Sequence, residues 1–222
     1  PGERITAILP VREFAPGTFI IMTTKKGMIK KTALRAFSNP RADGIIALHL
    51  KEGDSLVDVK LTKEEGELFI GTRLGKATRF KEGQLREMGR AASGVRGITL
   101  ESQDRLVDLE ILREGTALLS VTEKGYGKRT LLSEYRCQNR GGKGVINTLV
   151  SEKNGPVVGI LQVVVEDEVI LITDKGKILR LPVGDIPLRG RNTRGVRLIG
   201  LDEGEKVVGV ARLVEKEKKD LT

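Results

Sequence analysis

Several residue types on which protein chemistry often depends are scarce in this chain. Among its 222 residues there is one cysteine, Cys137, one histidine, His49, and no tryptophan. A single cysteine excludes a disulfide framework and makes an intracellular, cytoplasmic location the default. With one cysteine and one histidine, the chain has too few of the residues that form a zinc site or a nucleophile–histidine pair. We therefore expect no catalysis, no metal site and no cofactor within this chain.

Long apolar runs and aromatic side chains are scarce as well. No apolar stretch approaches the length that spans a membrane. Aromatic residues make up 3% of the chain, and proteins that bind single-stranded nucleic acid stack bases on such residues. The absence of tryptophan also argues against WD-repeat blades. These deficits favour contact with a duplex backbone over the other modes of nucleic-acid binding.

Positive charge is in excess. Lysine and arginine number 39 against 30 acidic residues, which gives a net charge of +9. This balance favours a polyanionic partner, although a charge excess often serves only solubility.

A four-residue turn motif, Thr-x-x-Gly, recurs about every fifty residues and marks a repeat in the sequence. Its copies are Thr24–Gly27, Thr72–Gly75, Thr122–Gly125 and Thr173–Gly176. Glycine takes positive φ freely, so each copy predicts a tight turn between two antiparallel strands. A short apolar run closes each repeat, and a period near fifty residues built from short strands is typical of propeller-like blades.

The sequence predicts an all-β fold with four complete repeats in one domain. The repeats span residues 17–61, 67–112, 116–165 and 167–213, preceded by an orphan N-terminal strand over 3–13 and followed by a charged tail, 214–222. Because the chain opens with Pro1-Gly2 inside a repeat, we expect it to be a piece of a larger protein. Ile45–Leu50 is expected to be a strand that contains His49, and Lys81–Glu87 to include a turn of helix.

Two sets of basic residues recur at fixed places in the repeats. The fourth residue after each turn glycine is basic: Lys31, Arg79, Arg129 and Arg180. The second set lies in glycine-containing loops and comprises Arg41, Arg90, Arg140, Lys143, Arg191 and Arg194. Cations beside bare backbone N–H groups suit phosphates. The alternatives are an outward-facing strand position for the first set and plain structural turns for the second.

These elements resemble a known family. Thr122-Glu-Lys-Gly-Tyr-Gly-Lys-Arg-Thr130 and Gln138-Asn-Arg-Gly-Gly-Lys-Gly144 are similar to motifs of the C-terminal domain of the DNA gyrase A subunit, and of its topoisomerase IV relatives. The resemblance covers essentially the whole chain. It implies a β-pinwheel, a propeller-like disc of four-stranded blades that exchange strands, whose basic rim binds and bends double-stranded DNA. It further implies, as partners, the rest of the topoisomerase A subunit, which carries the catalytic tyrosine, and an ATPase subunit.

The glycine loop resembles the hallmark box of that family, Gln-x-x-Gly-Gly-Lys-Gly with arginine at both variable places. The matching residues here are Gln138, Arg140, Gly141, Gly142, Lys143 and Gly144, while Asn139 replaces an arginine. The box of the family lies in the first blade, whereas this loop lies in the third complete repeat. Either the first blade lies upstream of this piece, which we favour, or the protein lacks a standard box.

Two other functions fit the repeats. A protein-interaction propeller would present loops to a protein partner and bind DNA weakly. A domain of the topoisomerase IV type would bind DNA without fully wrapping it.

Overall fold

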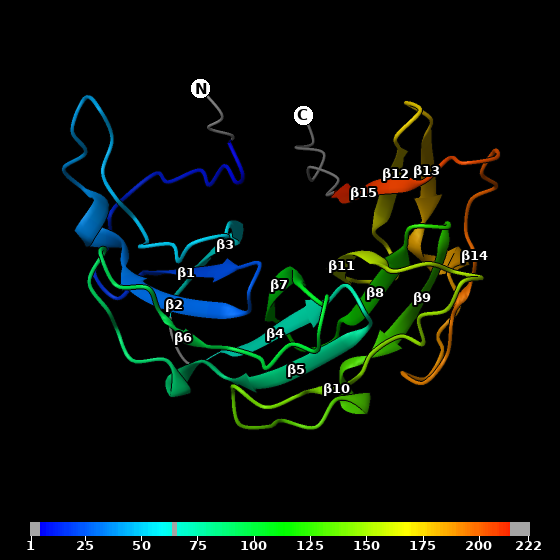
Figure 1. The fold of residues 1–222 in the computed structure, drawn as a ribbon, viewed down its shortest axis with the longest axis horizontal. Coiled ribbons are helices and arrows are strands. Elements are labelled where there is room, and N and C mark those ends of the chain that lie inside the picture. The colour runs from blue at the N-terminus through cyan, green and yellow to red at the C-terminus, as the bar shows by residue number, and fades with distance from the viewer. Residues whose placement is uncertain (1–4, 64–65, 214–222) are drawn as a thin grey trace, which may run out of the picture. The chain divides into compact units, whose positions relative to one another are not determined.

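Residues 5–63 and 66–213 are described in a computed structural model, and in those residues the regular elements are β-strands and single-turn 3₁₀ segments, with no α-helix (Figure 1). This confirms the predicted all-β class. The strands are β1 (Phe19–Thr24), β2 (Met28–Ala33), β3 (Leu56–Thr62), β4 (Glu67–Thr72), β5 (Lys76–Lys81), β6 (Val95–Arg96), β7 (Leu106–Leu112), β8 (Ala117–Thr122), β9 (Tyr126–Leu131), β10 (Val145–Ile146), β11 (Val157–Val163), β12 (Glu168–Thr173), β13 (Ile178–Pro182), β14 (Val196–Arg197) and β15 (Val207–Leu213).

The Thr-x-x-Gly motif forms the predicted hairpin turn in all four repeats. In each turn the glycine N–H donates to the threonine carbonyl, at 2.9–3.1 Å, and the glycine has a φ of 76–82°. The threonine is buried and stands where the pairing of its strand with the closing strand of the repeat shifts register. The motif thus defines both a hairpin turn and a β-bulge.

Each repeat contributes three antiparallel strands to a sheet, and the outer strand comes from the repeat that follows. The sheet orders are β3-β1-β2-β6, β10-β5-β4-β7, β11-β8-β9-β14 and β13-β12-β15. Val95 pairs with Ile29, Val145 with Ala77, and Val196 with Gly127. Among the described residues the fourth sheet has no such outer strand, so β13 has one strand neighbour.

Backbone contacts divide the chain into two compact units. The first holds residues 1–114 and 135–147, and the second holds residues 115–134 and 148–222. The segment 135–147 belongs to the first unit because β10 pairs with β5.

Each unit has its own apolar core between its two sheets. In the first unit, Ile21, Ile70, Phe80 and Leu109 belong to one cluster, and β3 packs against β7. In the second, Leu119, Leu171 and Val207 belong to another, and β11 packs against β15. One repeat cannot bury the apolar face of its sheet by itself, so each sheet packs against that of a neighbouring repeat.

Two predicted strands are wrong. Residues 5–13 of the orphan strand pair with no other strand, although Leu9 and Val11 pack against the cluster around Ile20. Glu3 and Arg4 lie outside the described residues. Ile45–Leu50 is also irregular, so His49 is an exposed loop residue. Their apolar alternation predicted strands, but a strand also needs a ladder of backbone hydrogen bonds, and the bond from the His49 N–H to the Ala92 carbonyl at 3.4 Å does not extend into one. The predicted tail, 214–222, lies outside the described residues as well.

Short 3₁₀ segments follow the second strand of each hairpin: η1 (Leu34–Phe37), η2 (Glu82–Gln84), η3 (Leu132–Glu134) and η4 (Val183–Asp185). The helical turn predicted within Lys81–Glu87 corresponds to η2. The other three were not predicted, since a single turn leaves little periodicity in the sequence.

Candidate nucleic-acid interface

Three basic loops dock onto a hairpin of the repeat before them through a glycine. Gly94, Gly144 and Gly195 have a φ of 70–82°. A Cβ atom on them would lie 2.6 Å from the Ile29 carbonyl oxygen, 2.4 Å from that of Ala77 and 2.4 Å from that of Gly127, respectively. No other residue fits so close to a backbone at that φ. The glycines therefore fix where each loop ends and where β6, β10 and β14 begin.

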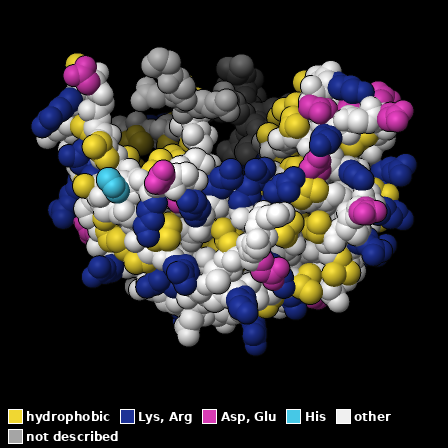
Figure 2. Space-filling model, in the orientation of Figure 1, with side chains coloured by type: hydrophobic (Ala, Val, Ile, Leu, Met, Phe, Trp, Pro, Cys, Tyr) yellow, Lys and Arg dark blue, Asp and Glu magenta, His cyan; other side chains and the backbone are white. Residues whose placement is uncertain are grey.

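The loop cations differ in exposure. Arg41, Lys143 and Arg194 are exposed, whereas Arg90, Arg140 and Arg191 are partly buried. Figure 2 shows Lys and Arg side chains spread widely over the face in view, with Asp and Glu side chains among them.

The box-like loop, residues 138–144, is held by Gln84 of η2. The Gln84 amide donates to the Gln138 carbonyl at 3.2 Å and accepts from the Arg140 backbone N–H at 2.9 Å. The Arg140 side chain donates to the carbonyls of Gln84 and Arg96 at 3.1 and 3.0 Å. Much of the Arg140 guanidinium thus binds the protein itself, while Lys143 and Asn139 remain exposed.

The cations that follow the turn glycines also have partners inside the protein. Lys31 is buried, lies 2.8 Å from the Glu82 carboxylate and sits 4.2 Å from the centre of the Phe19 ring. Arg79 donates to Glu67 at 2.7 Å, and Arg180 donates to Glu168 at 2.8 Å.

Arg129 completes this set by donating to the carbonyls of Ile186 and Gly184, at 2.5 and 3.3 Å. A phosphate would have to compete with these internal partners for each cation. The competition is weakest at Arg180, because its side chain is 59% exposed. Lys31 and Arg129 thus fasten their hairpins to other parts of the chain, as Arg79 does through the Tyr135 carbonyl at 3.1 Å. Arg180 binds Glu168 within its own hairpin.

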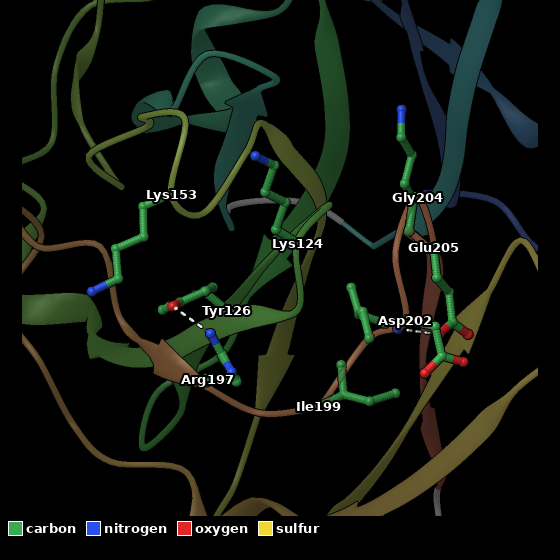
Figure 3. Close-up of a pocket in the computed structure, with 10 residues that line it drawn as sticks. Lys124, Tyr126, Lys153, Arg197, Ile199, Asp202, Gly204 and Glu205 are labelled. Carbon is green, nitrogen blue, oxygen red and sulfur yellow. Dashed lines mark hydrogen bonds between the residues drawn. The ribbon is translucent and has the colours of Figure 1, made fainter.

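A cleft of about 290 Å³ in the second unit is lined by one aromatic ring, that of Tyr126, and by several cations (Figure 3). The Arg197 guanidinium lies 5.7 Å from the centre of the Tyr126 ring, and the Lys153 ammonium lies 6.0 Å from it. Arg197 also donates to the Tyr126 hydroxyl at 3.4 Å, which lowers the pKa of that phenol. Lys124 and Lys206 line the same cleft.

Sequence reasoning missed this cluster. In the sequence Arg197 is only a basic residue two places after its loop glycine, and Lys153 lies in an unrelated turn. Only the pairing of β14 with β9 brings Arg197 opposite Tyr126.

The described residues contain no group of three or more Cys, His, Asp or Glu side chains that could hold a metal ion. Nor does that part of the chain include a helix long and apolar enough to cross a membrane.

Comparisons with known proteins agree over nearly the whole chain. The sequence model of a family described as "DNA gyrase C-terminal domain, beta-propeller" matches residues 18–63, 66–113, 117–163 and 167–213. The DNA gyrase A subunit of Salmonella typhimurium is 50% identical over 214 residues, and that of Clostridium acetobutylicum is 49% identical over 221 residues. These alignments cover 96% and 100% of this chain but 24% and 27% of the relatives.

Solved structures are similar too. The C-terminal domain of DNA topoisomerase IV has a TM-score of 0.87 at 28% sequence identity, and the alignment covers 92% of this chain and 64% of that one. The DNA gyrase A C-terminal domain has a TM-score of 0.84 at 26% identity, covering 92% and 68%. The four repeats, the exchanged outer strands and these similarities agree: the chain belongs to the DNA gyrase C-terminal domain family.

Proposed function

We propose that this domain binds double-stranded DNA through its phosphate backbone and bends it. The observation that carries the proposal is the repetition of a basic loop, docked through its glycine, from one repeat to the next. Lys143 and Arg194 are exposed at equivalent places in successive loops, immediately before the docking glycine. The net charge of +9 supports the same partner.

The proposed contacts fall into two groups. The loop cations Arg41, Arg90, Arg140, Lys143, Arg191 and Arg194 are the main phosphate ligands. In the other set, Lys31, Arg79, Arg129 and Arg180 already have internal partners, so we assign them a smaller share, with Arg180 the most accessible. Arg197, Lys153 and Lys124 around Tyr126 add a further place for a phosphate.

Binding to phosphates is nearly blind to sequence, because base edges carry the sequence information. Bending follows if one duplex contacts several loops. Smooth bending of a 20–30 base-pair segment by 40–90° costs roughly 1–6 kcal/mol, which several charge-assisted phosphate contacts can offset.

We further propose that the domain serves a cytoplasmic, bacterial, ATP-dependent DNA topoisomerase. The chain spans about a quarter of the length of its gyrase relatives. On this proposal, the catalytic tyrosine belongs to the rest of the polypeptide and the ATPase to a separate subunit.

The salt dependence of binding tests the partner. Release of counterions gives a slope of about −0.9 in log K against log salt for each phosphate neutralised, so six to ten contacts weaken binding about 10³–10⁵-fold between 50 and 200 mM. Fluorescence anisotropy of a labelled duplex measures this slope. A flat response, or no binding at 50 mM salt, would favour a protein-interaction propeller.

Energy transfer between dyes on the two ends of a duplex tests bending. A duplex of about 40 base pairs is short against the persistence length of roughly 150 base pairs, so free DNA keeps its ends apart. Bending brings the ends closer at saturating protein. An unchanged distance would leave binding without wrapping, as in the topoisomerase IV alternative.

A further inference from the structure

Two lysines are buried completely, which is unusual for this residue type. Lys30 on β2 and Lys128 on β9 are both 0% exposed. A buried ammonium is costly unless hydrogen-bond acceptors surround it. Both lysines are the third residue after a turn glycine, so they occupy the same place in the first and third repeats.

Lys30 binds the loop that carries Arg90. Its ammonium donates to the carbonyl oxygens of Arg90, of Ala92 at 3.2 Å and of Ala47 at 2.6 Å. Two of the three acceptors lie in the loop of residues 88–94, about sixty positions along the chain. The three N–H donors of the ammonium are thus all used.

Lys128 binds the loop that carries Arg191 in the same way. Its ammonium donates to the carbonyl oxygens of Gly190 at 2.7 Å and Arg191 at 2.6 Å, and to the Thr193 hydroxyl at 3.2 Å. All three acceptors lie in the loop of residues 189–195. In both repeats, therefore, a buried lysine holds the backbone carbonyl of an arginine that we propose to bind phosphate.

The second repeat provides an internal contrast. Thr78 occupies the equivalent place, and the loop of residues 138–144 is held instead by the Gln84 amide, which does not titrate. The loop of residues 138–144 is thus held in place by a neutral side chain instead of a buried lysine.

We propose that Lys30 and Lys128 are positioning residues that hold Arg90 and Arg191 ready for phosphate contact. The inference rests on the proposed DNA binding. A loop whose backbone is already ordered loses less conformational freedom when its arginine side chain binds, and this saving appears as affinity. Neither lysine touches the DNA itself, since both are buried.

The same arrangement makes the two loops sensitive to pH. Burial, and then the charge of Arg90, lower the pKa of Lys30 to about 8. Burial and Arg191 lower the pKa of Lys128 to about 8, while Glu134 acts in the opposite direction. An exposed lysine has a pKa near 10.5, so the docked loop binds this proton less tightly than the open loop does. Docking of the two loops therefore becomes more favourable as the pH rises from 7 to 9. Arginines keep their charge throughout this range.

Substitution by methionine tests the role of the lysines, because methionine has a similar length and no donor. We expect Lys30→Met with Lys128→Met to weaken duplex binding roughly two- to tenfold at pH 7. This is the loss in affinity expected when one or two more side chains must be ordered on binding. Wild-type affinity should rise from pH 7 to pH 9, because docking of the two loops becomes more favourable, and that of the variant should stay level. Lys51→Met with Lys63→Met removes two exposed charges and should keep the wild-type pH profile.

Amide hydrogen exchange of the unaltered protein gives a second test that needs no substitution. After correction for intrinsic rates, residues 88–94 and 189–195 should gain protection between pH 7 and pH 9, whereas residues 138–144 should not. Equal protection changes in all three loops, or a folded Lys30→Met with Lys128→Met variant with wild-type affinity and pH profile, would overturn the inference. A wild-type protein that binds no duplex would instead overturn the proposed function.

Discussion

Single glycines decide whether the basic loops can dock, and Gly195 gives the clearest test. At a φ of +80°, a Cβ atom there would lie 2.4 Å from the Gly127 carbonyl oxygen. We expect Gly195→Ala to lower the free energy of unfolding by about 1–3 kcal/mol, since both the backbone angle and the contact become strained. Urea unfolding measures the loss. Gly200→Ala is the control, because nothing lies within 4 Å of its position and its φ is not positive; a loss of the same size there would contradict this account.

Glu205 gives a prediction for acid stability. The backbone N–H of Asp202 and the Thr173 hydroxyl donate to its carboxylate at 2.9 and 2.6 Å, and Lys177 lies 2.9 Å away. These contacts lower its pKa from 4.5 to about 2. The unfolded chain therefore takes up this proton first as the pH falls. The stabilisation is complete above pH 4.5 and is lost between pH 4.5 and 2.

Glu205→Gln should remove this part of the pH dependence. We expect the urea midpoint of the wild type to fall more steeply between pH 4.5 and 2 than that of the variant. Glu203→Gln, which alters an exposed carboxylate, should retain the wild-type slope. Identical slopes for wild type and Glu205→Gln would show that the carboxylate contacts contribute nothing.

Some roles of single residues could be predicted from the sequence and others could not. The turn glycines could, because positive φ is a local demand. The partners of the basic set could have been found in part: Arg79 and Arg180 each bind a glutamate twelve positions earlier, Glu67 and Glu168, at the start of the facing strand. Nothing local marks Lys30 as buried, because its acceptors lie on loops far along the chain.

At the scale of elements, hairpins were predictable and exchanged strands were not. A hairpin joins neighbours through a turn whose residues reveal it. The pairing of Val95 with Ile29 joins two repeats, and a two-residue strand carries no periodicity. Ile45–Leu50 has the right alternation but forms no strand ladder in the described residues, where the His49 N–H donates to the Ala92 carbonyl at 3.4 Å and the Ala47 carbonyl accepts from the Lys30 side chain.

The buried pair of Lys31 and Glu82 fastens η2 to β2, and the Thr62 hydroxyl of β3 donates to the same carboxylate at 2.7 Å. We expect Glu82→Ala to cost about 3–5 kcal/mol, because it leaves the Lys31 ammonium buried without its counter-charge. Thermal and urea unfolding measure this. The pair of Lys76 and the exposed Glu101, 3.7 Å apart, is the control, and Glu101→Ala should cost at most about 1 kcal/mol. A cost below about 1 kcal/mol for Glu82→Ala would mean that water reaches Lys31.

For the whole molecule, the salt slope counts the phosphates engaged. Replacing the exposed loop cations Arg41, Lys143 and Arg194 by alanine should make the slope shallower by about 2.7, at roughly 0.9 for each lost contact. Replacing Lys51, Lys63 and Lys175 removes the same charge from exposed positions outside the basic loops and should change the slope little. Equal changes in both triple variants would indicate that net charge alone governs binding.

The exchange of outer strands has a consequence for synthesis on the ribosome. The sheet of β1, β2 and β3 has all its own strands once residue 62 has emerged, yet it needs Val95 and Arg96 for its edge. At about 5–20 residues per second, this wait lasts roughly two to seven seconds. During it the edge of β2 is open, and open edges pair readily with other chains. A translational pause between these two points would expose nascent chains to one another, so the speed of decoding over each interval bears directly on the yield of folded protein.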